Sequence, residues 1–82
     1  MVADVRVKAG VEADLGLVCY RQGDYANAAK HFDIANQSVV HLLSREKGTA
    51  ISDTFANVLW TQRARDISRQ RASEVLGGNK RP

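Results

Sequence analysis

The sequence predicts an all-α fold, an antiparallel bundle of three helices. Three observations lead to this fold class. Apolar residues recur at spacings of three and four over three long segments, which is the period of an amphipathic helix. The one proline is Pro82, at the very end of the sequence, so no proline ring interrupts a helix before it. The breaks between the segments contain glycine, which suits a helix terminus.

The first helix is expected from about Ala3 to Gln22. Gly10 weakens its early part by roughly 1 kcal/mol relative to alanine. The reversal at Gly23-Asp24 follows, with glycine suited to the end of one helix and aspartate to the N-cap of the next. The apolar stripe of this first helix consists of Val7, Val11, Leu15, Val18 and Cys19.

The second helix is expected to start after Asp24 and to end near Lys47-Gly48, with Gly48 as its C-terminal glycine. Its apolar stripe is the clearest in the chain, since it persists over about five turns of 3.6 residues. The members of this stripe are Tyr25, Ala28, Ala29, Phe32, Ala35, Val39, Leu42 and Leu43.

The third helix is expected to start near Thr49 or Ser52 and to end at Leu76, where Gly77-Gly78 stops it. One of its stripes contains Ile51, Phe55, Val58, Leu59, Gln62, Ala72 and Leu76. A second stripe contains Ala56, Trp60, Ala64 and Ile67. We therefore expect residues 1–76 to form one interaction domain and residues 77–82 to form a flexible C-terminal tail.

The expected core joins the main stripes of the three helices. Short connections make neighbouring helices antiparallel, so the helices run up, down and up. The residues expected in the core are Leu15, Val18, Cys19, Tyr25, Ala28, Phe32, Ala35, Val39, Leu42, Phe55, Val58 and Leu59.

Size and composition argue against several classes of function. The chain has 82 residues, of which 44% are apolar and 26% charged, as in one small globular domain. Cys19 is the only cysteine, and with His31 and His41 it forms no metal-binding motif, so we expect no metal and no cofactor. We find no signal peptide and no membrane span, and expect a cytoplasmic protein. No nucleophile, base and orienting group stand in a recognisable pattern, so we expect no enzymatic activity.

The segment Leu15–Ala35 carries the one distinctive motif. Its matching positions are Leu15, Gly16, Gly23, Tyr25, Ala28, Phe32 and Ala35. This segment resembles a single tetratricopeptide repeat, a hairpin of two helices that cross closely at small residues. The likeness places Gly16 and Ala28 at the crossing, with Tyr25 and Phe32 filling the gap beside them. Because the motif occurs once and no proline follows it, we do not expect a solenoid of stacked repeats.

Such a hairpin followed by one long helix resembles a microtubule-interacting and trafficking (MIT) domain, whose length is similar to that of Val5–Leu76. The family has the glycine-aspartate-tyrosine turn found here at Gly23-Asp24-Tyr25, and an aromatic residue at the place of Phe32. Its arginine-alanine pair late in the third helix corresponds to Arg63-Ala64 or Arg71-Ala72.

The resemblance implies a targeting domain that binds short tails of membrane-remodelling filament proteins, as in the ESCRT-III system. The implied site is a groove between the third helix and either the first or the second. The family often places acidic residues near this groove. Here the third helix offers Asp53, Asp66 and Glu74 against four arginines, which suggests an acidic partner or a divergent tail.

We therefore predict a protein-interaction module that holds a peptide or tail between helices. Trp60 either packs at the edge of the bundle or lines the partner groove. The residues predicted to contact the partner are Leu42, Phe55, Leu59, Trp60, Arg63, Ile67 and Arg69. Two alternatives stay open: a repeat-like module that self-associates as a homodimer, and a basic third helix that binds an acidic polymer, either tubulin tails or nucleic acid.

Overall fold

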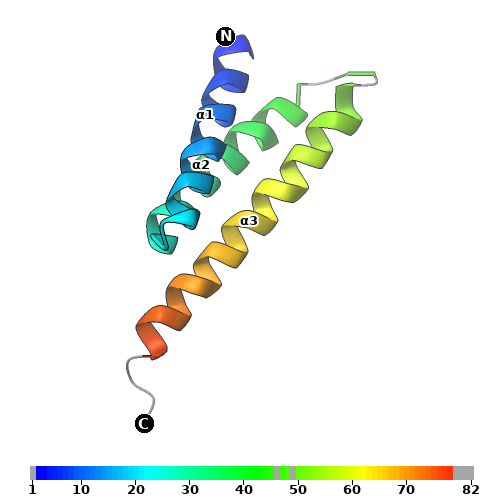
Figure 1. Cartoon of the computed structure of the whole chain (residues 1–82). Coiled ribbons are helices and arrows are strands. Elements are labelled where there is room, and N and C mark those ends of the chain that lie inside the picture. The colour runs from blue at the N-terminus through cyan, green and yellow to red at the C-terminus, as the bar shows by residue number, and fades with distance from the viewer. Residues whose placement is uncertain (1, 46, 49, 79–82) are drawn as a thin grey trace.

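Three helices make up the described part of the chain in the computed structural model of Figure 1. They are α1 (Val2–Arg21), α2 (Tyr25–Leu43) and α3 (Ala50–Gly78). The structure describes residues 2–45, 47–48 and 50–78, and this part of the chain contains no strand. In Figure 1, α1 and α3 run downward and α2 runs upward. The predicted all-α fold, an antiparallel three-helix bundle, is confirmed.

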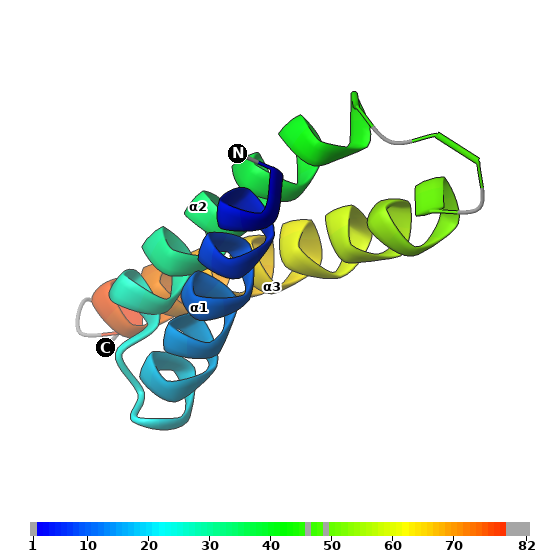
Figure 2. The ribbon, with the colours of Figure 1, turned by 90° about the horizontal axis from the view of Figure 1, so that it is seen from above.

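Helix α2 is the central element, because α1 and α3 each pack along it and have few contacts with each other. Helix α3 has 29 residues and extends past the turn that joins α1 to α2, as Figure 1 shows. Figure 2 shows the same three helices from above. The molecule is therefore elongated, with extents of 54 × 18 × 15 Å along its principal axes.

The reversal between α1 and α2 is built on Gly23, as the sequence predicts. Gly23 has a φ of +79°, which a glycine adopts without steric strain. Its N–H donates to the carbonyl of Tyr20 and the N–H of Asp24 donates to the carbonyl of Cys19, which together form a Schellman motif. Asp24 precedes α2 as expected, but its carboxylate makes no capping bond and instead accepts a hydrogen bond from the Asn27 side chain at 2.7 Å.

Helices α1 and α2 cross closely at Gly16, and this too agrees with the sequence motif. A Cβ atom at Gly16 would lie only 2.8 Å from two ring carbons of Phe32, which is 1% exposed. Ala28 is fully buried on the same face of α2. A polar contact also joins the two helices at their edge, where His31 Nδ1 lies 2.6 Å from Glu12 Oε2.

Helix α2 ends at Leu43, four residues before the predicted end at Lys47-Gly48. The Ser44 side chain donates to the carbonyl of His41, and Ser44 and Arg45 close the last turn with backbone bonds, so the helix needs no glycine to end. Gly48 has a φ of +67° but lies in the connection to α3. This connection is longer than the two or three residues that the sequence suggests, and Thr49, one predicted cap, lies outside the described residues.

The predicted core is correct for α2 and partly wrong for α1 and α3. Ala28, Phe32, Ala35, Val39, Leu42 and Val58 are buried as predicted, and Cys19 and Tyr25 are half-buried. Leu15, Val18, Phe55 and Leu59 are all exposed. Apart from Val58, the faces that pack on α2 are made of small or polar residues, namely Ala9, Ala13 and Gly16 from α1 and Thr54, Thr61 and Ser68 from α3.

Helix α3 includes Gly77 and Gly78, where the sequence predicts that it stops. Glycine lowers helix stability by about 1 kcal/mol per residue but does not forbid helical dihedral angles. The rest of the predicted tail, residues 79–82, lies outside the described residues.

The close approach at Gly16 gives a test with a matched control. Gly16→Ala places a methyl group against the buried Phe32 ring, which has no room to move, so we expect a loss of about 1–2 kcal/mol in the free energy of unfolding. Gly10→Ala meets nothing within 4 Å, and we expect a gain of up to about 1 kcal/mol from helix propensity. Urea unfolding followed by circular dichroism measures both. Equal effects of the two substitutions would contradict the crossing at Gly16.

Candidate functional site

A groove opens between α1 and α3, above a floor formed by α2. Val39 and Leu42 of α2 lie at its base, and its volume is about 200 Å³. The lining residues are Arg6, Ala9, Gly10, Ala13, Val39, Leu42, Thr54, Asn57, Trp60 and Thr61. Only Arg6 among these carries an ionisable side chain. The groove is therefore mainly apolar, with hydroxyl and amide groups on its α3 side.

Trp60 is the largest side chain in the wall of the groove. Its ring makes an edge-to-face contact with Phe32, with centroids 6.1 Å apart, and its Nε1 donates to Asn57 Oδ1 at 3.2 Å. The side chain is nevertheless 40% exposed. Trp60 thus packs on the bundle through Phe32 and also lines the groove, while its predicted contact with a partner stays a prediction.

The α1 wall of the groove is made of small residues. Ala9, Gly10 and Ala13 carry at most a methyl group, and Arg6 is the one long side chain that α1 contributes to the lining. A Cβ atom added at Gly10 would meet no atom within 4 Å. This wall leaves space for an incoming side chain beside Trp60.

The structure distributes the seven predicted contact residues over three places. Leu42 and Trp60 lie in the groove. Leu59, Arg63 and Ile67 line a shallow depression on α3. Phe55 is exposed on α3 one turn before Leu59. Arg69 lies on the opposite side, toward α2, in a depression that it shares with Asp33.

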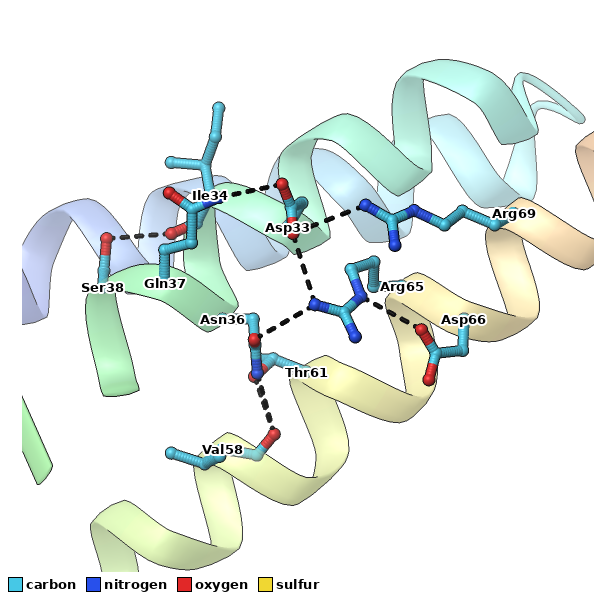
Figure 3. A network of polar contacts seen from close by, with 10 residues as sticks. All are labelled: Asp33, Ile34, Asn36, Gln37, Ser38, Val58, Thr61, Arg65, Asp66 and Arg69. Carbon is cyan, nitrogen blue, oxygen red and sulfur yellow. Dashed lines mark hydrogen bonds and ion pairs between the residues drawn. The ribbon is translucent and has the colours of Figure 1, made fainter. Parts of the chain in front are cut away.

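The interface of α2 with α3 is held by a polar network centred on Asn36, which is buried (Figure 3). The Asn36 side-chain amide donates to the carbonyl of Val58 at 3.0 Å and to Thr61 Oγ1 at 3.1 Å. Its Oδ1 accepts from Arg65 Nη1 at 3.4 Å. These bonds fix the rotation of α3 about its axis, because a small turn of α3 would leave the buried amide without partners.

Arg65 extends this network to two carboxylates. Its Nε donates to Asp66 Oδ1 at 3.0 Å and its Nη1 lies 3.4 Å from Asp33 Oδ1. The hydrogen bond to Asp66 and, to a smaller extent, the contacts with Asp33 raise the pKa of Arg65 above its ordinary value, against the opposing effect of burial. Arg69 Nη2 also lies 3.6 Å from Asp33 Oδ1.

The four arginines of α3, namely Arg63, Arg65, Arg69 and Arg71, therefore fall into two pairs. Arg65 and Arg69 pair with acidic side chains of the protein itself, whereas Arg63 and Arg71 are exposed and make no ion pair with any residue that the structure describes. Of the four arginines of α3, Arg63 and Arg71 are thus the two that are not engaged by a described carboxylate.

Sequence reasoning missed several residues of the groove and of the network. The small residues Ala9, Gly10 and Ala13 belong to no motif. Small residues do recur at helical spacing from Ala9 through Ala13 to Gly16, and this recurrence is the signal that could have indicated the face. Asn36 and Thr61 were not singled out, because polar residues inside an apolar period give no sign of their partners. Leu42 and Trp60 were the members of the groove that the sequence indicated.

Comparisons with known proteins do not place the chain in a family, since no family model, curated protein or solved structure matches it. Among the described residues, no helix combines the length and the apolar character needed to cross a membrane.

The polar network predicts a difference between two neighbouring arginines. Arg65→Met removes contacts with two carboxylates and Asn36, and we expect it to lower the free energy of unfolding by about 1–2 kcal/mol, less at high salt. Arg63→Met, the matched control, removes no ion pair and should change stability by less than about 0.5 kcal/mol. Urea unfolding at low and high ionic strength measures the difference. If both variants are equally stable, Arg65 does not hold α3 to α2.

Proposed function

We propose that this protein is an interaction module that binds a helical segment of a partner protein in the groove between α1 and α3. The single observation that supports this most strongly is Trp60, a half-exposed indole in the wall of a groove with an apolar floor. Tryptophan is among the residues that most often dominate the energy of protein interfaces, since it buries a large area with few rotatable bonds.

The arrangement of the helices favours a helix as the occupant. α1 and α3 run in the same direction on either side of α2, so a fourth helix in the groove would complete a four-helix bundle. The small residues of the α1 wall would allow its backbone to come close. An amphipathic helix in a groove, anchored by side chains one turn apart, is a recurring mode of peptide recognition.

The size and chemistry of the groove favour a peptide over a small-molecule substrate. A volume of about 200 Å³ is below the roughly 300–1,000 Å³ that pockets for cofactors and drug-sized ligands occupy. It suits one or two inserted side chains. With Arg6 as its only ionisable lining residue, the groove offers no pair of acid and base for catalysis, and we propose binding without an enzymatic activity.

The class of partner follows from the sequence resemblance and remains a proposal. An MIT-like domain would bind tails of ESCRT-III-type filament proteins in a trafficking process, in a groove between the third helix and a neighbour. The groove beside Trp60 corresponds to one of the two grooves that the resemblance implies, the one between the third and first helices.

The only tryptophan of the chain makes the proposal directly testable. Synthetic peptides from the C-terminal tails of ESCRT-III-type proteins are titrated into the protein while Trp60 emission is recorded. We expect a blue shift that saturates, because the indole loses contact with water. Chemical-shift changes in NMR spectra should follow α1 and α3 around Ala9, Ala13 and Thr61.

A blocking variant and a matched control complete the experiment. Gly10→Leu fills the groove from a position where no atom stands in the way, so it should abolish binding and keep the fold. Ala56→Leu adds the same side chain at an exposed position that does not line the groove, and should bind as the unmodified protein does. If Gly10→Leu binds normally, or if shift changes map elsewhere, the groove is not the site.

A further inference from the structure

The outer face of α1 carries an apolar stripe that nothing in the bundle covers. Its members are Val7, Val11, Leu15 and Val18. They are between 42% and 65% exposed, although their spacing of three and four residues is that of a coiled-coil seam. The face of α1 that packs on α2 lies opposite and is made of Ala9, Ala13 and Gly16. The stripe is therefore directed away from α2, and none of its four members lines the groove.

Two opposite charges border this stripe on one side. Asp14 and Arg21 are separated by seven residues, two helical turns, so they lie above one another along the same edge. Both are exposed, and neither makes an ion pair with any of the residues that the structure describes. Charges at such flanking positions select the partner and the orientation of helices that pair along an apolar seam.

We propose that two copies of this chain associate through α1, with the two helices antiparallel about a two-fold axis near Gly16-Leu17. In this arrangement Leu15 of each copy packs on Val18 of the other. Asp14 of each copy then lies opposite Arg21 of the other, which gives two equivalent ion pairs. A two-fold interface needs a surface that complements itself in this way, residue by residue.

The charges decide between the possible pairings of the two stripes. A parallel pairing places the edge with Asp14 and Arg21 beside the opposite edge of the other copy, so the two charges would not meet. An antiparallel pairing centred near Ala13 covers more of Val7, but it brings the two copies of Asp14 together. Moving the axis to Gly16-Leu17 keeps Leu15 and Val18 in contact and joins the opposite charges.

The same observations favour a second copy over an unrelated partner. Leu15 and Val18, with Asp14 and Arg21 beside them, supply both halves of the contact, with no net charge to be balanced from elsewhere. The interface would be small, since one pair of helices forms it, so association should be weak and depend on concentration. It is also separate from the groove, so Trp60 should report peptide binding without reporting dimerisation.

Sedimentation equilibrium under reducing conditions, chosen because Cys19 is a free thiol, tests the association between about 10 µM and 1 mM protein. We expect a reversible dimer. Val18→Lys should weaken it by roughly tenfold or more, because a charge replaces an apolar contact in both copies. The matched control is Val40→Lys, since Val40 on α2 has the same exposure of 47%. It should leave the dimer unchanged, and circular dichroism confirms that both variants fold.

A charge exchange then tests the orientation. Asp14→Arg and Arg21→Asp each set like charges against one another in a homodimer, and should each weaken association by roughly tenfold. Mixed together, the two variants regain both ion pairs, so they should form a mixed dimer in preference to either homodimer. The double variant Asp14→Arg/Arg21→Asp should dimerise as the unmodified protein does.

Three results would overturn the proposal. A strict monomer over the whole concentration range removes the dimer. Loss of the dimer in Val40→Lys but not in Val18→Lys would show that the two copies meet through exposed apolar residues of α2 and α3 and not through α1. Absence of a preference for the mixed dimer rejects the pairing of Asp14 with Arg21. The peptide titration of the groove stands apart from all three, because Gly10→Leu fills the groove and replaces none of the four residues that form the proposed dimer contact, Asp14, Leu15, Val18 and Arg21.

Discussion

The packing of the Phe32 ring is the contact on which the rest of the structure depends. Phe32 belongs to α2, lies against Gly16 of α1 and makes an edge-to-face contact with Trp60 of α3, so it touches all three helices. Because no side chain stands at Gly16, α1 can approach the ring closely. That approach turns the small-residue face of α1 inward, and it leaves the groove between α1 and α3 open above the floor of α2.

The second constraint is polar. α3 is attached to α2 through Asn36, Thr61 and Arg65, whose hydrogen bonds require one rotation of the helix (Figure 3). A buried amide that loses its partners costs free energy, so this rotation is more sharply defined than apolar packing alone would make it. As a consequence Phe55 and Leu59 face outward. Phe55 and Leu59 are thus exposed because the polar interface between α2 and α3 requires one rotation of α3.

Two separate surfaces follow from these constraints. The groove beside Trp60 is concave and nearly free of ionisable groups, which suits the capture of a helix. The outer face of α1 is a convex stripe with Asp14 and Arg21 along one edge, which suits pairing with its own copy. A dimer would present two grooves at once, and a partner with two tails would then bind more tightly than one groove allows, without any new contact.

The sequence by itself determined the three helices, their order, the reversal at Gly23 and the close crossing of Gly16 with Phe32. These features depend on residues near one another in the chain and on conformations that glycine adopts readily. It also indicated Leu42 and Trp60 as members of the groove. Only the tertiary structure decided which faces of α1 and α3 turn inward. Periodicity identifies apolar stripes, but the inward face of α3 carries Thr54, Thr61 and Ser68 beside Val58. That choice of face rests on bonds such as the one between Asn36 and Thr61, which lie far apart in sequence.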